Sequence, residues 1–157
     1  MKRRIVRTFG QVSDGDYQAV LTRFDPEAVH WFSGQHALGG TRDNIADIGA
    51  WYARWEKLLP DLKFEVTEVV VSGWPWATVV AVEWVQTGAA DRTANFRNTG
   101  VHLIRLRWGR TVSQRVHCDT AVLAEFLRRL QTQGVREAVA APIGSAAPPP
   151  QLGLAAN

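Results

Sequence analysis

Residues 98–119, NTGVHLIRLRWGRTVSQRVHCD, have the pattern of two strands joined by a tight turn. A two-residue Gly-X loop at Gly109-Arg110 is typical of a type II′ hairpin, whose twist suits the flanking strands. This register predicts that His102 lies opposite His117. Because strand side chains alternate between faces, Asp119 is expected on the same face as these two imidazoles.

The same face is also expected to carry three apolar side chains, those of Ile104, Leu106 and Trp108. A surface of this composition is typical of the wall of a small-molecule pocket. The lone cysteine, Cys118, faces the other way in this register, which favours a small packed side chain over a nucleophile. One cysteine also excludes an internal disulfide and fits a reducing compartment. These expectations depend on the loop length, because a one-residue change would reverse the faces of one strand.

The composition is that of a soluble globular chain. Its 157 residues, 46% hydrophobic and 21% charged, give room for one domain with a core. The formal charge is only +3, and no basic run with interleaved aromatics follows Lys2-Arg3-Arg4, so we expect no nucleic-acid partner. No stretch approaches the ~18 apolar residues of a membrane span, and no signal peptide opens the chain. We therefore expect a cytoplasmic protein without a membrane partner.

Hydrophobic periodicity predicts the order of the elements. Helices are expected over 3–11, over Tyr17–Phe24 with Ser13 or Asp14 as the cap, over Arg42–Leu59 with Thr41 as the cap, and over Thr120–Gln133. Strands are expected over 28–32, 62–72, 76–87, 94–108 and 111–118, with a glycine-rich loop at 33–40 and a turn at 88–93. The long helix presents large side chains on one face, at Ile45, Ile48, Tyr52, Trp55 and Leu59.

This order predicts an α+β fold, in which three helices pack on the concave face of a curved mixed or antiparallel sheet and enclose a cavity. The second of the long strands, rich in valine, is expected to be central and covered on both sides. The domain is predicted to span residues 1–133. Residues 134–157 are rich in Ala, Pro and Gly, and we expect them to be disordered or draped on the surface.

Three segments resemble the nuclear-transport-factor-2-like superfamily of cone-shaped domains, and within it the SnoaL-like proteins. Gly15–Phe24 with Phe32–Gly40 resembles the second helix, first strand and glycine loop, and Asn98–Arg110 resembles the family's strand and hairpin. Val116–Thr120 resembles the strand end that an aspartate often follows. The similarity covers about residues 10–133. It implies the fold strongly and the activity weakly, because members include isomerases, cyclases, epoxide hydrolases and non-catalytic binding proteins.

The resemblance also assigns positions. Trp31 falls where ketosteroid isomerases have their aspartate base, and His102 falls where they have the acid of the oxyanion hole. The position of their tyrosine falls near Val6 to Phe9, which hold no phenol, so the resemblance argues against that mechanism. Asp119 matches the acid/base aspartate of polyketide cyclases of this type.

Two candidate catalytic residues therefore emerge, each with a structural alternative. Asp119 is either an acid/base or the N-cap of the following helix. His102 is either a proton shuttle or donor to a carbonyl, or a packed core histidine. Four histidines without an i,i+4 pair or a Cys-x-x-Cys motif do not predict a metal site, and no cofactor is implied.

The sequence thus predicts a protein that binds an apolar small molecule. The leading hypothesis is acid/base catalysis on a polyketide- or terpenoid-like substrate by Asp119 with His102 as its partner. The predicted substrate-binding residues are Trp31, Tyr52, Trp55, Trp84, Asn98 and His117. The alternative is a non-catalytic binding or interaction module of the same fold, and either form is expected to be a homodimer through the sheet.

Overall fold

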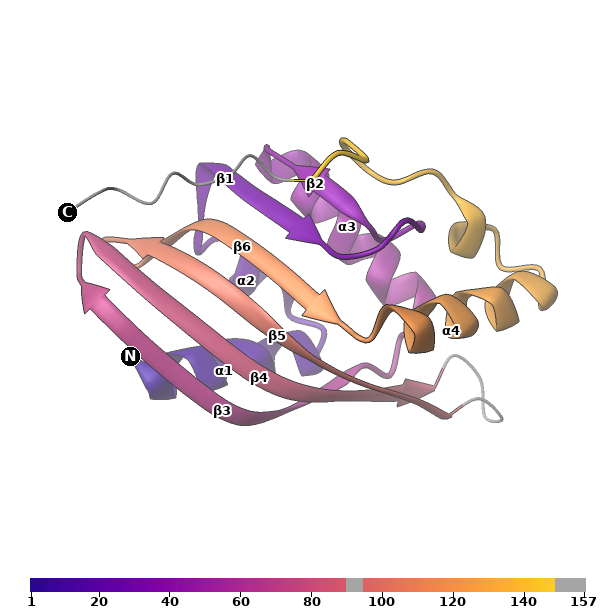
Figure 1. Ribbon diagram of the computed structural model, residues 1–157, viewed down its shortest axis with the longest axis horizontal. Coiled ribbons are helices and arrows are strands. Elements are labelled where there is room, and N and C mark those ends of the chain that lie inside the picture. The colour runs from indigo at the N-terminus through magenta and orange to yellow at the C-terminus, as the bar shows by residue number, and fades with distance from the viewer. Residues whose placement is uncertain (90–94, 149–157) are drawn as a thin grey trace.

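The structure is a computed structural model that describes residues 1–89 and 95–148 (Figure 1). Its helices are α1 (Lys2–Ser13), α2 (Tyr17–Leu21), α3 (Ile45–Leu58), α4 (Thr120–Thr132) and the 3₁₀ turn η1 (Arg136–Val139). Its strands are β1 (Phe24–Phe32), β2 (Gly40–Arg42), β3 (Lys63–Trp74), β4 (Ala77–Ala89), β5 (Asn95–Arg107) and β6 (Arg110–Cys118). The turn expected at 88–93 falls largely on residues 90–94, which lie outside the described residues.

The strands form one curved six-stranded sheet in the order β2-β1-β6-β5-β4-β3. All neighbours are antiparallel except β1 and β6, so the sheet is mixed. Helices α1, α2 and α3 lie against one face of this sheet, and α4 extends beyond the end of β6 (Figure 1). This is the α+β arrangement predicted from the sequence, with three helices over the concave face.

Helix α3 supplies most of the apolar cover of that face. Trp51, Tyr52 and Trp55 are buried at the spacing that places them on one side of a helix. The helix begins three residues later than predicted, because Asn44, not Thr41, accepts the capping bond from Asp47 N. Gly40–Arg42 forms β2 instead, and the buried Arg42 guanidinium donates to backbone carbonyls, including that of Gly39 at 3.1 Å.

The start of the chain also differs in its details from the prediction. Asp16, not Ser13 or Asp14, caps α2, which ends at Leu21. Strand β1 begins earlier than expected, at Phe24, and passes through Pro26 where its pairing with β6 is interrupted. Proline donates no backbone hydrogen bond, so this irregular stretch of the sheet tolerates it. Strand β4 buries alternate side chains and leaves Glu83 exposed, so it is fully covered on one face only.

The β5–β6 hairpin has a different turn from the predicted one, and this changes which side chains share a face. Trp108 and Gly109 form the two-residue loop, with φ of 51° and 77°, as a type I′ turn requires. An irregularity between the Arg105 and Leu106 pairs then shifts the register again. The net displacement is one residue, so His117 faces Val101 and His102 faces Val116.

This displacement corrects three expectations. His102 and His117 lie on opposite faces of the sheet, because a one-residue slip reverses every side chain of β6. Cys118 pairs with Gly100, and therefore shares the concave side with His102 instead of facing away from it. The Trp108 side chain does not join that face, because the turn leaves it 70% exposed.

Residues 134–148 are not the free tail that their composition suggests. Ala138 of η1 is buried, Val135 and Ile143 pack against the core, and Ser145 pairs with Thr41 through two backbone hydrogen bonds. Of the two alternatives expected for this segment, these contacts fit a chain that is draped on the surface, and they continue past residue 133. Residues 149–157 lie outside the described residues.

Candidate functional site

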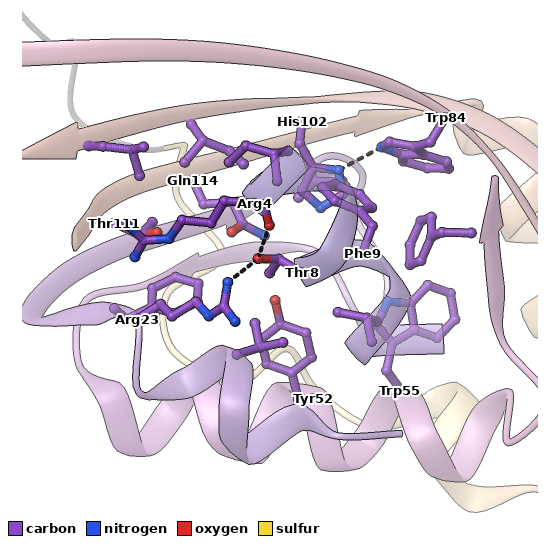
Figure 2. A pocket seen from close by; sticks show the side chains of 18 of the residues that line it. Arg4, Thr8, Phe9, Arg23, Tyr52, Trp55, Trp84, His102, Thr111 and Gln114 are labelled. Atoms are coloured by element: carbon purple, nitrogen blue, oxygen red, sulfur yellow. Dashed lines mark hydrogen bonds between the residues drawn. The ribbon is translucent and has the colours of Figure 1, made fainter. Parts of the chain in front are cut away.

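A cavity lies between the concave face of the sheet and helices α1, α2 and α3 (Figure 2). Its volume is about 70 Å³. Most of its wall is apolar, and aromatic rings from several elements meet there: Phe9, Phe24, Phe32, Trp51, Tyr52, Trp55, Phe64 and Trp84. The volume is below the ~300 Å³ at which ligand pockets usually begin.

His102 and Trp84 form the central polar pair of the wall. The Trp84 indole N–H donates to His102 Nδ1 at 2.6 Å, and both side chains are buried. An indole nitrogen only donates, so Nδ1 must be the acceptor and the neutral imidazole carries its proton on Nε2. Burial lowers the pKa of His102 to about 3, because the charged imidazolium would lose its hydration. His102 is thus a neutral N–H donor at physiological pH.

Tyr52 places a second donor in the cavity from the opposite side. Its hydroxyl projects from α3 toward the sheet (Figure 2) and interacts with the Gln114 side chain. Burial raises the pKa of Tyr52 to about 12, although the Gln114 hydrogen bond offsets part of that effect. The phenol therefore remains protonated. Gln86 and Thr111 add further buried polar groups to the sheet side of the wall.

The N-terminal half of α1 closes one end of the cavity. Arg23 reaches across from the α2–β1 connection and donates to Thr8 Oγ1 (Figure 2). It also donates to Gln11 Oε1, at 2.6 Å. Arg4 Nη2 donates to the carbonyl of Gly109 in the β5–β6 turn, at 3.1 Å. Met1, Arg4 and Gly109 line the cavity at this end, so we call it the mouth.

Among the described residues no aspartate or glutamate lines the cavity. Its polar groups are an imidazole N–H, a phenol, hydroxyls, amides and, at the mouth, two guanidinium groups. Such a set stabilises an oxygen that carries negative charge, but it offers no carboxylate base. The geometry therefore suits polarisation of a carbonyl or binding of an enolate or phenolate better than proton abstraction by an aspartate.

Asp119, the first catalytic candidate, lies away from this cavity. Its carboxylate caps α4 by accepting from the backbone N–H groups of Ala121 at 3.0 Å and Val122 at 3.2 Å. The side chain is exposed and does not line the cavity. The structure therefore does not bring Asp119 together with His102, and it places Asp119 in the capping position that was the structural alternative.

The predicted substrate-binding residues divide into two groups. Tyr52, Trp55 and Trp84 line the cavity, as their positions on the long helix and on β4 suggested. Trp31 and His117 lie on the other face of the sheet, where their rings are in contact, tilted by 59° with centroids 4.9 Å apart. Asn98 is buried, but its amide donates to the carbonyl of Asp119 and it does not line the cavity. Trp31 thus does not occupy a base position inside the cavity.

The sequence interpretation missed several cavity residues. Gln114 was missed because the wrong hairpin register turned it outward, and the correct register would have placed it beside Ile104. Phe9, Arg4 and Arg23 belong to the first helix and the α2–β1 connection, and no sequence signal linked these segments to β5.

On β1 the side chain that points toward the helices is that of His30, whereas that of Trp31 was expected to do so from the sequence. It is fully buried, with its ring centroid 4.5 Å from that of Trp51, and neither of its ring nitrogens has a hydrogen-bond partner among the described residues. Burial lowers its pKa well below the usual value, with a smaller contribution from the positive charge of Arg42. His30 is therefore a neutral core histidine next to the cavity wall.

Comparison with known proteins identifies the family. Residues 4–114, more than half of the chain, match the model of the SnoaL-like domain. The chain therefore belongs to the SnoaL-like domain family, as the resemblance in its sequence implied. No curated protein matches the sequence.

Solved structures show the same fold at low sequence identity. Bal32a, from a soil-derived mobile gene cassette, is 18% identical with a TM-score of 0.70, covering 80% of this chain and 94% of its own. TerC, co-crystallised with polyporic acid, is 21% identical with a TM-score of 0.67, covering 78% and 93%. IdmH, a putative polyketide cyclase from Streptomyces antibioticus, is 20% identical with a TM-score of 0.65, covering 81% and 97%.

Proposed function

We propose that this protein binds an apolar, ring-containing small molecule of the polyketide type in its cavity, and polarises one of the ligand's oxygens through His102. The observation that carries the proposal is the Trp84–His102 pair, a fixed and neutral N–H donor within a largely apolar wall. A buried N–H donor without a partner costs free energy, and an acceptor that enters the cavity removes this cost. We therefore infer that a ligand oxygen accepts this hydrogen bond.

The wall chemistry favours a particular class of ligand. Aromatic side chains provide a large apolar contact area, and the His102 imidazole and Tyr52 phenol reach the cavity from opposite sides. A flat ring system with a carbonyl or an acidic hydroxyl complements both features. Polyporic acid, the aromatic hydroxyquinone found with TerC, is a ligand of this chemistry and serves as a probe.

Binding requires the cavity to enlarge. A volume of about 70 Å³ holds a few water molecules but no ring system. The start of α1 is the element that can yield most readily, because only Ile5 is buried before Phe9, and the other contacts there, those of Arg4 with Gly109 and of Arg23 with Thr8, are polar. These contacts exchange for water more readily than the packed rings of α3 do. We therefore expect α1 to move outward as the ligand enters.

The chemistry that follows from such binding is enolisation. An N–H donor on a carbonyl oxygen lowers the pKa of the adjacent carbon acid. Because no described cavity residue is a carboxylate, a solvent base takes the proton from that carbon, and the enolate oxygen so formed accepts the hydrogen bond of the His102 N–H. Asp119 has no part in this proposal. The second candidate function is binding without catalysis, which the lack of a carboxylate among the described cavity residues favours.

The test compares two histidine variants. His102→Phe keeps an aromatic ring in the wall and removes the donor, whereas His117→Phe makes the same change on the outer face. We expect polyporic acid binding, measured by calorimetry, to weaken about tenfold in His102→Phe, as the loss of one hydrogen bond to a charged oxygen implies, and to stay unchanged in His117→Phe. Equal affinities in all three proteins would refute the role of His102.

A second readout separates catalysis from binding. Deuterium exchange at the carbons next to the carbonyl of 2-tetralone, followed by proton NMR, reports enolisation directly. Acceleration by the native protein but not by His102→Phe supports the catalytic form of the proposal. Binding of polyporic acid without accelerated exchange supports the non-catalytic form.

A further inference from the structure

Three tryptophan side chains form an exposed group at one end of the sheet, which we call the indole cluster: Trp74, Trp76 and Trp108. They are 67%, 53% and 70% exposed. The rings of Trp74 and Trp76 stack with centroids 5.5 Å apart, and Trp108 lies 6.0 Å from Trp76. Isolated exposed apolar residues are common, but three adjoining indoles form a contiguous patch that calls for a function.

The backbone holds this cluster together. The N–H of Trp108 donates to the carbonyl of Pro75 at 2.7 Å, which joins the β5–β6 turn to the β3–β4 turn. Trp108 adopts a left-handed conformation that favours Gly or Asn, so the bulky indole is displayed at a conformational cost. A turn selected for stability alone would place a smaller residue here.

Several cations lie at the same end of the sheet as the cluster, together with one acid, Asp25, which follows the residue whose carbonyl accepts from Arg110. The first two turns of α1 carry exposed Lys2, Arg3 and Arg7, and the contact between Arg4 and Gly109 places this helix end beside the turn of Trp108. Exposed Arg107 and Arg110 flank that turn. Residues 1–13 hold no acid, and neither do residues 95–118. The start of α1 and both turns lie at the same end of the sheet (Figure 1).

We propose that the indole cluster and these cations dock this protein on an anionic lipid bilayer. Indoles partition to the interface between lipid headgroups and acyl chains, where the ring is apolar and the N–H remains hydrated. Lysine and arginine side chains beside them bind anionic headgroups. Charge complementarity thus selects anionic lipid over a neutral surface, and the indoles select a bilayer over a soluble polyanion.

The indole cluster lies at the same end of the molecule as the mouth of the cavity. Met1, Arg4 and Gly109 line the mouth of the cavity and belong to the same end of the molecule. An apolar molecule dissolved in the bilayer would therefore meet the mouth directly.

Docking itself does not depend on the proposed ligand. It differs from the expectation, made from the sequence, that the protein has no membrane partner. That expectation considered only continuous apolar runs, whereas the three indoles come together from two separate turns. Among the described residues no helix has the length and apolarity to cross a bilayer, so the contact would be interfacial.

The experiment is co-sedimentation of the full chain with vesicles. Phosphatidylcholine vesicles containing about 25% phosphatidylglycerol are expected to pellet the protein, and pure phosphatidylcholine vesicles about tenfold less of it. Binding should fall at about 0.5 M NaCl, which screens the cations. Brominated acyl chains should quench part of the tryptophan fluorescence, because the indoles enter the interface.

Two double variants separate the contribution of the indoles to vesicle binding from that of the cations. Trp76→Ser with Trp108→Gly removes two indoles, and glycine suits the left-handed turn position, so folding is preserved. Arg3→Glu with Arg7→Glu reverses the charge of α1. Both are expected to lose vesicle binding about tenfold, whereas Arg97→Glu with Arg136→Glu, the same charge change away from the mouth, keeps it.

Three results would overturn the proposal. One is no pelleting with anionic vesicles, and another is native-level binding by the variant lacking Trp76 and Trp108. The third is that the cluster serves another partner: a single-stranded oligonucleotide, or a second copy of the chain, that binds the native protein in place of vesicles and fails to bind this variant. Circular dichroism and thermal unfolding establish that each variant is folded, and polyporic acid binding reports separately on the cavity.

Discussion

His102 illustrates how one hydrogen bond fixes the chemistry of a buried group. The Trp84 indole can only donate, so it decides which imidazole nitrogen is free of a proton and which one carries it. Burial then prevents protonation at ordinary pH. The outcome is a donor whose state does not vary over the physiological range, unlike that of an exposed histidine.

The first prediction concerns acid stability. The pKa of His102 is about 3 in the folded chain and that of His30 is also lowered, whereas both are near the ordinary 6.5 after unfolding. The unfolded chain therefore binds more protons than the folded chain between about pH 3 and 6.5. Stability contributed by these neutral histidines is complete above that window and is lost as the pH falls through it. The free energy of unfolding, from urea titrations, should drop by up to about 1.4 kcal/mol per pH unit for each histidine.

A variant tests whether His102 contributes to this change of the free energy of unfolding with pH. His102→Gln removes one titrating group and keeps an acceptor for the Trp84 indole, so its stability should depend less steeply on pH between 5 and 6.5 by about one proton. His117→Gln, which makes the same change in an exposed ring on the outer face, is the matched control. Identical slopes for all three proteins would mean that His102 takes up its proton without unfolding.

The second prediction concerns Asp119. As an N-cap it satisfies two backbone N–H groups of α4, so Asp119→Ala should lower the free energy of unfolding by about 1 kcal/mol, while Asp119→Asn retains most of it. Neither change should alter polyporic acid binding or deuterium exchange. Urea denaturation with these two assays checks the prediction, and loss of exchange in a stable Asp119→Asn protein would restore its catalytic candidacy.

At the scale of elements, the close approach between β5 and Trp84 stabilises the site. A Cβ added at Gly100 would lie 2.3 Å from the carbonyl oxygen of His117 and 2.5 Å from the Trp84 ring. No side chain fits there without displacement. The glycine on β5 therefore lets the indole lie flat enough on the sheet to reach His102 with its N–H.

The third prediction follows from this contact. Gly100→Ala should destabilise the protein by about 1–3 kcal/mol and should weaken polyporic acid binding, because the displaced indole releases His102. Gly10→Ala is the matched control. A Cβ there meets nothing within 4 Å, and alanine is the better helix former, so the change in α1 should stabilise by about 0.5–1 kcal/mol. Equal effects of the two substitutions on urea unfolding would contradict the packing at Gly100.

At the scale of the whole molecule, the outer face of the sheet is the second large surface. Val70 and Val101 are exposed there; Val101 pairs with His117, whose ring contacts that of Trp31, and Val70 lies on the edge strand β3. Such a partly apolar face fits the homodimer expected from the sequence. It lies on the opposite side of the sheet from the cavity, so pairing would leave the ligand site unobstructed.

The fourth prediction tests that pairing. Val70→Asp with Val101→Asp places two carboxylates on the face, and we expect the mass measured by sedimentation equilibrium to fall from that of a dimer to that of a monomer. Because both positions are exposed, folding should persist. Trp76→Ser with Trp108→Gly should leave the dimer intact. A native protein that sediments as a monomer would disprove the expectation.

Much of the fold could be predicted because its signals are local. The spacing of large side chains predicted α3 and alternation predicted β3 to β6, whereas Asp119 was the leading catalytic candidate and its capping role was the structural alternative. Of the expected site residues, His102, Tyr52, Trp55 and Trp84 line the cavity, because their faces follow from local patterns and do not depend on the hairpin register. Predictions that depended on pairing failed, since a loop shifted by one residue exchanged Gln114 for His117 on the cavity face.

The sequence by itself determined the family, the order of the elements and the aromatic character of the cavity, because periodicity and composition act over short stretches of chain. Only the tertiary structure decided that His102 meets an indole, that α1 closes the cavity, and that three indoles from two turns share one surface. These are contacts between residues far apart in the chain, and their geometry depends on exact strand register and helix placement, which local patterns do not specify.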